Sequence, residues 1–121
     1  MVRRAAVLLA LVCAPGAAQT QLELTADAAG ELNAAKTRLK AVYDSIASKY
    51  GADSRQRLRE AEDAWTLYRD KQCYFENKLT EGGSIHSMLV YQCLKVLTDR
   101  RIAELRRQEN CRDGDFSCVR N

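Results

Sequence analysis

Two cysteines lie at equal distances from a pair of glycines, and this spacing limits how the chain can fold. Cys73 lies ten residues before Gly83, and Cys93 lies ten residues after it. If helices on both sides reverse direction at Gly82-Gly83, the two sulfur atoms reach the same height on facing helices. We therefore expect a Cys73–Cys93 disulfide. It would close a loop of about twenty residues and contribute about 3 kcal/mol in the chain-entropy model.

The sequence around these cysteines is typical of helices. The only proline, Pro15, lies near the N-terminus, and the following residues are rich in Ala, Leu, Glu, Arg and Lys. Apolar residues recur every three or four positions in three segments, residues 27–50, 53–79 and 84–108. We predict an all-α fold, a small antiparallel three-helix bundle or helical hairpin held by disulfides.

The apolar positions of each segment mark the face that we expect to be buried. In the first segment they are Leu32, Ala35, Leu39, Val42, Ile46 and Tyr50. In the second they are Leu58, Ala61, Trp65, Tyr68 and Phe75. In the third they are Ile85, Met88, Leu89, Leu94, Leu97, Ile102 and Leu105. We expect Gly51 to end the first helix, Asp53 to cap the second and Ser84 to cap the third.

Residues 1–19 have the organisation of a secretory signal peptide. Arg3 and Arg4 precede an apolar stretch over residues 5–12, and small residues follow it. The stretch is too short to span a membrane as a helix. We expect cleavage after Ala18 or Gln19 and export to the periplasm or the medium.

A lipoprotein signal is the alternative for the same segment. It would be cleaved before Cys13, and the lipid would be attached to that cysteine. Such signals carry a small residue directly before the cysteine, but this chain carries Val12 there. We therefore favour export without a lipid anchor.

The cysteines that follow the N-terminal segment are expected to form disulfides, because exported proteins reach an oxidising compartment. There are four of them, Cys73, Cys93, Cys111 and Cys118. Four cysteines allow three pairings, and a Cys73–Cys93 bond leaves Cys111 to pair with Cys118. This second pair flanks the turn signal Asp113-Gly114. We expect a helical domain over residues 20–110 and a disulfide-closed tail over residues 111–121.

Charge and motif content disfavour several functions. The chain has 19 Lys and Arg against 16 Asp and Glu, a net charge of +3, and removal of the signal peptide with Arg3 and Arg4 leaves +1. A nearly neutral chain is not typical of a dedicated nucleic-acid binder. The chain has no C-x-x-C motif, no zinc-ligand spacing, no phosphate-binding glycine loop and no convergent catalytic set. We expect no cofactor, no metal site, no transmembrane segment in the mature chain, and a binding protein rather than an enzyme.

Residues 61–73, AEDAWTLYRDKQC, resemble the central signature A-x-x-x-W-x-x-Y-R-x-x-x-C of the LprI-type lysozyme inhibitor domain. Gly82-Gly83-Ser84 resembles its G-G-S turn, and residues 93–105 resemble its C-L-x-x-L-T-x-x-R-x-x-E-L helix. The resemblance covers residues 31–105 and implies a small, exported, all-helical domain. It implies a lysozyme inhibitor that acts by protein–protein binding. The alternative is a cell-envelope interaction module without lysozyme activity.

Four residues of these motifs are expected to pack or pair within the domain. Trp65, Tyr68 and Arg69 share a helix, and the four-residue spacing lets the Arg69 guanidinium lie over the indole of Trp65. Arg101 is expected to pair with a carboxylate of the second helix, such as Glu62 or Asp70. The alternative for this cluster is a recognition patch. A further alternative is that the basic end of the third helix binds an anionic polymer or lipid through Arg100, Arg101, Arg106 and Arg107.

The loop between the second and third helices is the segment that we predict to contact a protein partner. A loop at the disulfide-held end of a hairpin is rigid and loses little entropy on binding. The candidate contact residues are Glu81, Gly82, Gly83, Ser84 and His86. No oxyanion motif or nucleophile turn accompanies His86, so we predict a contact role for it. The resemblance implies lysozyme as the partner.

Overall fold

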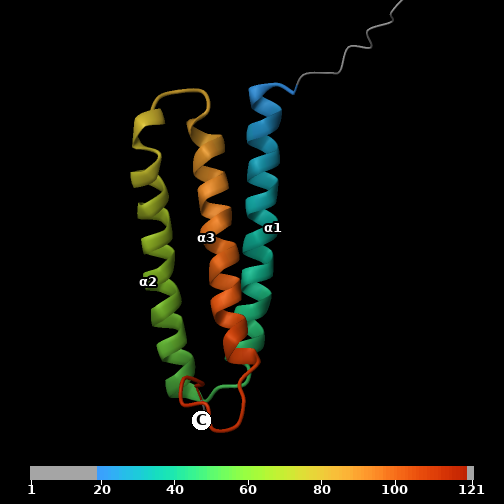
Figure 1. Cartoon of the computed structure of the whole chain (residues 1–121), viewed down its shortest axis with the longest axis vertical. Coiled ribbons are helices and arrows are strands. Elements are labelled where there is room, and N and C mark those ends of the chain that lie inside the picture. Colours follow the sequence, from blue (N-terminus) through green and yellow to red (C-terminus); the bar gives the residue numbers. More distant parts are fainter. Residues whose placement is uncertain (1–18, 120–121) are drawn as a thin grey trace, which may run out of the picture.

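The computed structural model describes residues 19–119, which form three long helices and no strand (Figure 1). The elements in chain order are α1 (Gln21–Ala47), α2 (Ala52–Glu76), the short 3-10 helix η1 (Lys78–Thr80) and α3 (His86–Glu109). The predicted all-α fold is confirmed. The predicted signal peptide, apart from Gln19, and the alternative lipidation site Cys13 lie outside the described residues.

α3 lies between the other two helices, and α1 runs beside it in the same direction (Figure 1). α2 runs antiparallel to both. α3 packs closely on α1 and more lightly on α2. Consecutive helices do alternate in direction, as predicted, but the main packing partner of α1 is α3 rather than α2.

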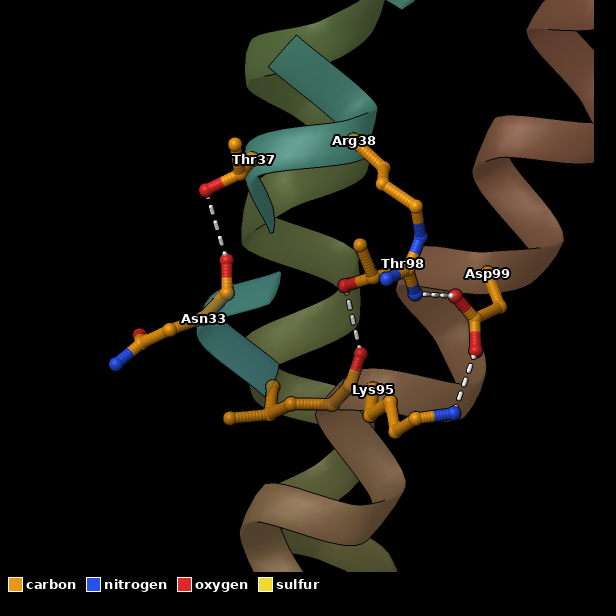
Figure 2. A network of polar contacts seen from close by, with 7 residues as sticks. Asn33, Thr37, Arg38, Lys95, Thr98 and Asp99 are labelled. Carbon is orange, nitrogen blue, oxygen red and sulfur yellow. Dashed lines mark hydrogen bonds and ion pairs between the residues drawn. The ribbon is translucent and has the colours of Figure 1, made fainter. Parts of the chain in front are cut away.

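The core lies mainly between α1 and α3. The buried residues of α1, which follow an alternating spacing of four and three, are Ala28, Leu32, Ala35, Leu39, Val42 and Ile46. Those of α3 are Val90, Leu94, Thr98, Ile102 and Leu105. The fully buried Thr98 hydroxyl donates to the Leu94 carbonyl oxygen at 2.7 Å, so its burial leaves no unpaired hydroxyl (Figure 2). The spacing in α1 keeps one continuous apolar stripe against α3.

α1 begins and ends earlier than the predicted range 27–50. Thr20 and Glu23 form a capping box, in which the Thr20 hydroxyl accepts from the Glu23 backbone at 3.2 Å and the Glu23 carboxylate accepts from the Thr20 backbone at 2.7 Å. These bonds satisfy two backbone donors that a helix start otherwise leaves open. The helix ends at Ala47, and Gly51 is the N-cap residue of α2.

The predicted caps of α2 and α3 are wrong. Asp53 lies inside the first turn of α2 and pairs with Arg57 at 2.8 Å. Ser84 lies in the turn before α3, whose N-cap residue is Ile85. The last turn predicted for α2 is instead the tighter helix η1, which leads into the glycine turn.

The predicted buried face of α2 is also partly wrong. Tyr68 and Phe75 are exposed by 55% and 75%. The inward residues are the half-buried Trp65 and the buried Arg69 and Cys73. The true inner face includes a charged side chain, so an apolar pattern did not reveal it.

Both predicted disulfides are present. Cys73 pairs with Cys93 and Cys111 pairs with Cys118, each with a Cα–Cα distance of 5.7 Å. Cys73 is fully buried in a cluster with Leu32, Val90 and Leu94. The Cys73–Cys93 bond therefore fastens α2 to the α1–α3 pair toward the end of the molecule where α2 turns into α3, which we call the hairpin end.

α2 has a second attachment nearer its start. Leu58 and Trp65 pack against a cluster of buried residues from α1 and α3. These are Leu39, Val42, Ile46, Ile102 and Leu105. α2 thus contacts the core with a few side chains, whereas α1 and α3 bury continuous stripes.

Asp99 of α3 links α1 to α3 at the surface (Figure 2). It accepts from Arg38 of α1 at 3.1 Å and from Lys95 of α3 at 2.8 Å. The hydrogen bond from Lys95, with that from Arg38, holds the pKa of Asp99 below its ordinary value. The two ion pairs of Asp99 contribute modestly to stability, because water reaches all three side chains.

Removal of the Cys73–Cys93 bond should destabilise the protein strongly. The double variant Cys73→Ser/Cys93→Ser should lose about 3 kcal/mol and about 10 °C or more of Tm. The matched control Cys111→Ser/Cys118→Ser should lose less than about 1 kcal/mol, because that bond joins two parts of one surface tail. Thermal unfolding followed by circular dichroism measures both, and equal Tm losses would contradict the prediction.

The stability contributed by Asp99 should disappear in acid. Its pKa is lowered in the folded state, so its contribution is present above the unfolded-state pKa and is lost as the pH falls through the lowered value. Asp99→Asn should cost less than about 1 kcal/mol near neutral pH, and this cost should shrink as the pH falls through the lowered pKa of Asp99. Urea unfolding of the wild type and the variant over a series from neutral to acid pH tests this. A difference that does not change with pH would refute it.

Candidate functional site

The turn between α2 and α3 depends on its two glycines. Gly82 has φ +80°, a left-handed conformation that favours glycine. The Gly83 backbone donates to the Thr80 carbonyl at 2.9 Å, and a Cβ on Gly83 would lie 3.1 Å from that oxygen. The chain therefore reverses here through a backbone angle that favours glycine at Gly82 and a close backbone approach at Gly83.

Side-chain contacts also order this turn. Thr80 and the His86 ring share a hydrogen bond of 3.0 Å between Oγ1 and Nδ1. The His86 ring lies 6.2 Å from the ring of Tyr74, in a tilted arrangement. Glu81 pairs with Lys78, and this hydrogen bond holds the pKa of Glu81 below its ordinary value. The turn is tied to both the end of α2 and the start of α3.

The five predicted contact residues lie together at this end of the molecule. Glu81, Gly82, Gly83 and Ser84 are exposed, and His86 is half-buried in the first turn of α3. They form a projecting turn rather than a cleft. Such a surface is suited to contact with a larger partner.

Exposed apolar side chains surround the turn, and the sequence prediction missed them. Leu79 of η1 is fully exposed, Phe75 and Tyr74 of α2 are mostly exposed, and Ile85 is 41% exposed. Cys73 could have revealed the position of Phe75. Helical residues two positions apart in the sequence point about 200° apart around the helix axis. A buried Cys73 therefore directs Phe75 away from the core.

A second constellation lies where α2 crosses α3. Arg69 and Arg101 place their Cζ atoms 5.1 Å and 5.8 Å from the Trp65 ring centroid. The Arg101 guanidinium donates to Glu62 and to Glu104, each at 3.0 Å. Arg69 stacks on Trp65, as predicted. Of the two carboxylates predicted for Arg101, Glu62 is the one that pairs with it. Asp70 pairs with Arg69 instead.

The residues around Trp65 are largely buried, and their charges are paired with one another, so this cluster holds α2 against α3. The Arg101 and Glu62 side chains are 15% and 17% exposed, and the buried Arg69 pairs with Asp70 at 2.7 Å. Each guanidinium is thus paired with a carboxylate, as buried charges require. Tyr68, the fourth residue of the predicted motif, is outside this cluster and faces solvent.

Comparison with known proteins identifies the family. The family described as "Lysozyme inhibitor LprI" matches residues 13–105. The chain belongs to the LprI family. One relative, a protein of Rhizobium meliloti (strain 1021) described as uncharacterized, is 33% identical over an alignment of 105 residues that covers 78% of this chain and 76% of the relative. No solved structure matches.

The LprI match includes both constellations described above. The glycine turn and the Trp65 cluster lie inside residues 13–105, whereas Cys111 and Cys118 lie beyond them. Within residues 19–119, no group of His, Cys, Asp or Glu is placed to hold a metal ion, and no helix there has the length and apolarity to cross a membrane. The family is described as a lysozyme inhibitor family.

Two hollows flank α2, but neither gathers a reactive set of side chains. One, of about 330 Å³, separates α1 from α2 over an apolar floor of Leu39 and Tyr43. The other, of about 350 Å³, lies at the opposite end from the glycine turn and includes Tyr50. Burial raises the pKa of Tyr50, and its hydroxyl has no protein partner. A water molecule can satisfy such a group.

Arg101 should stabilise the protein far more than its neighbour Arg100. Arg101→Met leaves the Glu62 carboxylate half-buried and unpaired, which should cost about 1–3 kcal/mol. Arg100→Met, at an exposed position of the same helix, should change stability by less than about 0.5 kcal/mol. Adding Glu62→Gln to Arg101→Met should recover part of the loss. Urea unfolding measures all three, and equal losses at positions 100 and 101 would disprove the structural role.

Proposed function

We propose that this LprI-family protein inhibits lysozyme by binding it with the turn between α2 and α3. The proposal rests on the family match and on the exposure of this turn at a covalently held end of the molecule. The contact residues would be Glu81, Gly82, Gly83, Ser84 and His86. The mechanism is obstruction of lysozyme by a bound protein, without chemistry by this chain.

The construction of the turn supports this role. The Cys73–Cys93 bond joins α2 to α3 next to the turn, and hydrogen bonds involving Thr80 hold Gly83 and His86. A surface ordered before binding loses less conformational entropy when the complex forms. The exposed side chains around it provide apolar area that a partner can bury.

We also infer that the protein acts outside the cytoplasm. Two disulfides and an N-terminal sequence typical of a signal peptide support export. We favour cleavage after Ala18 or Gln19 over lipidation at Cys13. Lysozyme attacks the cell wall, so an exported inhibitor would meet it there.

A bulky residue in the turn should weaken inhibition strongly. In a cell-wall clearance assay, the mature, oxidised protein in excess should slow lysozyme. Ser84→Trp should raise the concentration needed for half inhibition at least tenfold, because the indole would obstruct a close contact, a loss typical of about 1.4 kcal/mol or more. Ser45→Trp, an exposed position on α1 at the opposite end, should inhibit like the wild type.

The outcomes separate the site from the activity. Inhibition by Ser84→Trp at the wild-type concentration would refute the turn as the contact site. Failure of the wild type to slow clearance at any excess would refute lysozyme inhibition. The interaction-module alternative would then be favoured, and a pull-down from periplasmic extract would test it.

A further inference from the structure

The hairpin end exposes apolar side chains that the fold leaves uncovered. Phe75 and Leu79 are 75% and 100% exposed, and Leu22, in the first turn of α1, is 80% exposed. α1 begins at the same end of the molecule as the turn between α2 and α3 (Figure 1). Gln21 bonds to Met88 at 3.6 Å, which places the start of α1 next to the start of α3. Large exposed apolar side chains gathered at one end indicate a contact surface.

Charge is divided along the long axis of the molecule. The hairpin half, residues 19–35 and 72–94, has five acidic residues and one basic residue, a net charge of −4. The acidic residues are Glu23, Asp27, Glu31, Glu76 and Glu81. The other half, residues 36–69 and 95–119, has fourteen basic and ten acidic residues, a net charge of +4. The charges of Asp70 and Lys71 at the border cancel each other. Residues 19–119 therefore have no net charge, but negative and positive charge are separated along the long axis.

We propose that the hairpin end docks on a cationic protein surface, with Phe75 and Leu79 buried in the contact. This inference rests on the proposed function and specifies its partner as a basic lysozyme. The net charge of the whole chain gives no attraction to such a partner. The charge of the hairpin half does, and it acts at the end where the apolar side chains lie.

The division of charge also selects the orientation of the complex. A cationic partner is attracted by the −4 half and repelled by the +4 half, so encounters are steered toward the hairpin end. Charge steering acts mainly on the association rate, and burial of apolar side chains acts mainly on the dissociation rate. The two contributions can therefore be tested separately.

The first test neutralises acidic residues and follows association with a basic lysozyme of the common type at low salt. Asp27→Asn/Glu31→Gln should slow association about three- to tenfold and weaken its salt dependence. The matched control Glu60→Gln/Asp63→Asn removes the same two residue types from exposed positions of α2 in the other half. It should leave association unchanged or slightly faster.

The second test removes apolar side chains and follows dissociation from the same lysozyme. Phe75→Ala/Leu79→Ala should speed dissociation at least tenfold, a factor that corresponds to 1.4 kcal/mol. Leu67→Ala/Phe116→Ala is the matched control, because it removes one leucine and one phenylalanine that are exposed away from the hairpin end. It should dissociate like the wild type. All four side chains are exposed, so the variants should keep the wild-type Tm.

Binding and inhibition are measured on the same samples, which separates this inference from the proposed function. The inference is overturned if lysozyme binds but the hairpin variants behave like their controls, and inhibition can still stand in that case. Binding at the hairpin end without slower cell-wall clearance supports the inference and refutes inhibition. If lysozyme does not bind at all, both are refuted.

Discussion

The Cys73–Cys93 bond is the constraint on which the arrangement of the helices depends. α1 and α3 bury matching stripes and hold each other, but α2 has only two buried residues, Arg69 and Cys73. At the hairpin end, the disulfide supplies the attachment to the other helices that apolar contacts of α2 do not provide. It limits the freedom of α2 in the unfolded chain and places its last turns against α3. Three helices of this size have a small core, for which such a bond is a common supplement.

The other attachment of α2 is electrostatic as much as apolar. The guanidinium groups of Arg69 and Arg101 both lie near the Trp65 ring, and the carboxylates of Glu62 and Asp70 compensate these charges. Inward-facing charge is tolerable here because each group is paired. With one end of α2 held by sulfur and its middle held by this cluster, the turn at Gly82 becomes a rigid extremity. That rigidity connects the fold to the binding role that we propose.

Much of the fold could be predicted from the sequence, and the errors have physical causes. The cysteine spacing led to the correct disulfides, and five of the six apolar positions predicted for α1 are buried. The apolar pattern predicts the wrong face for part of α2, because Arg69 occupies an inward position that such a pattern cannot reveal. The periodicity also predicts too late a start for α1, although Thr20 and Glu23 carry the local capping signature. The segment predicted to project is an exposed turn, but Phe75 and Ile85 beside it, which the apolar pattern places in the core, are exposed.

The sequence by itself determined the helices, the point where the hairpin reverses and the pairing of the cysteines, because each depends on spacing within one stretch of chain. The tertiary structure decided that α1 packs on α3 rather than on α2, because that choice compares the apolar stripes of all three helices. It also decided the surface at the hairpin end. Segments 19–35 and 72–94, which carry the acidic side chains of this end, are far apart in the chain. They share one end of the molecule only because the folded helices bring those segments to the same height.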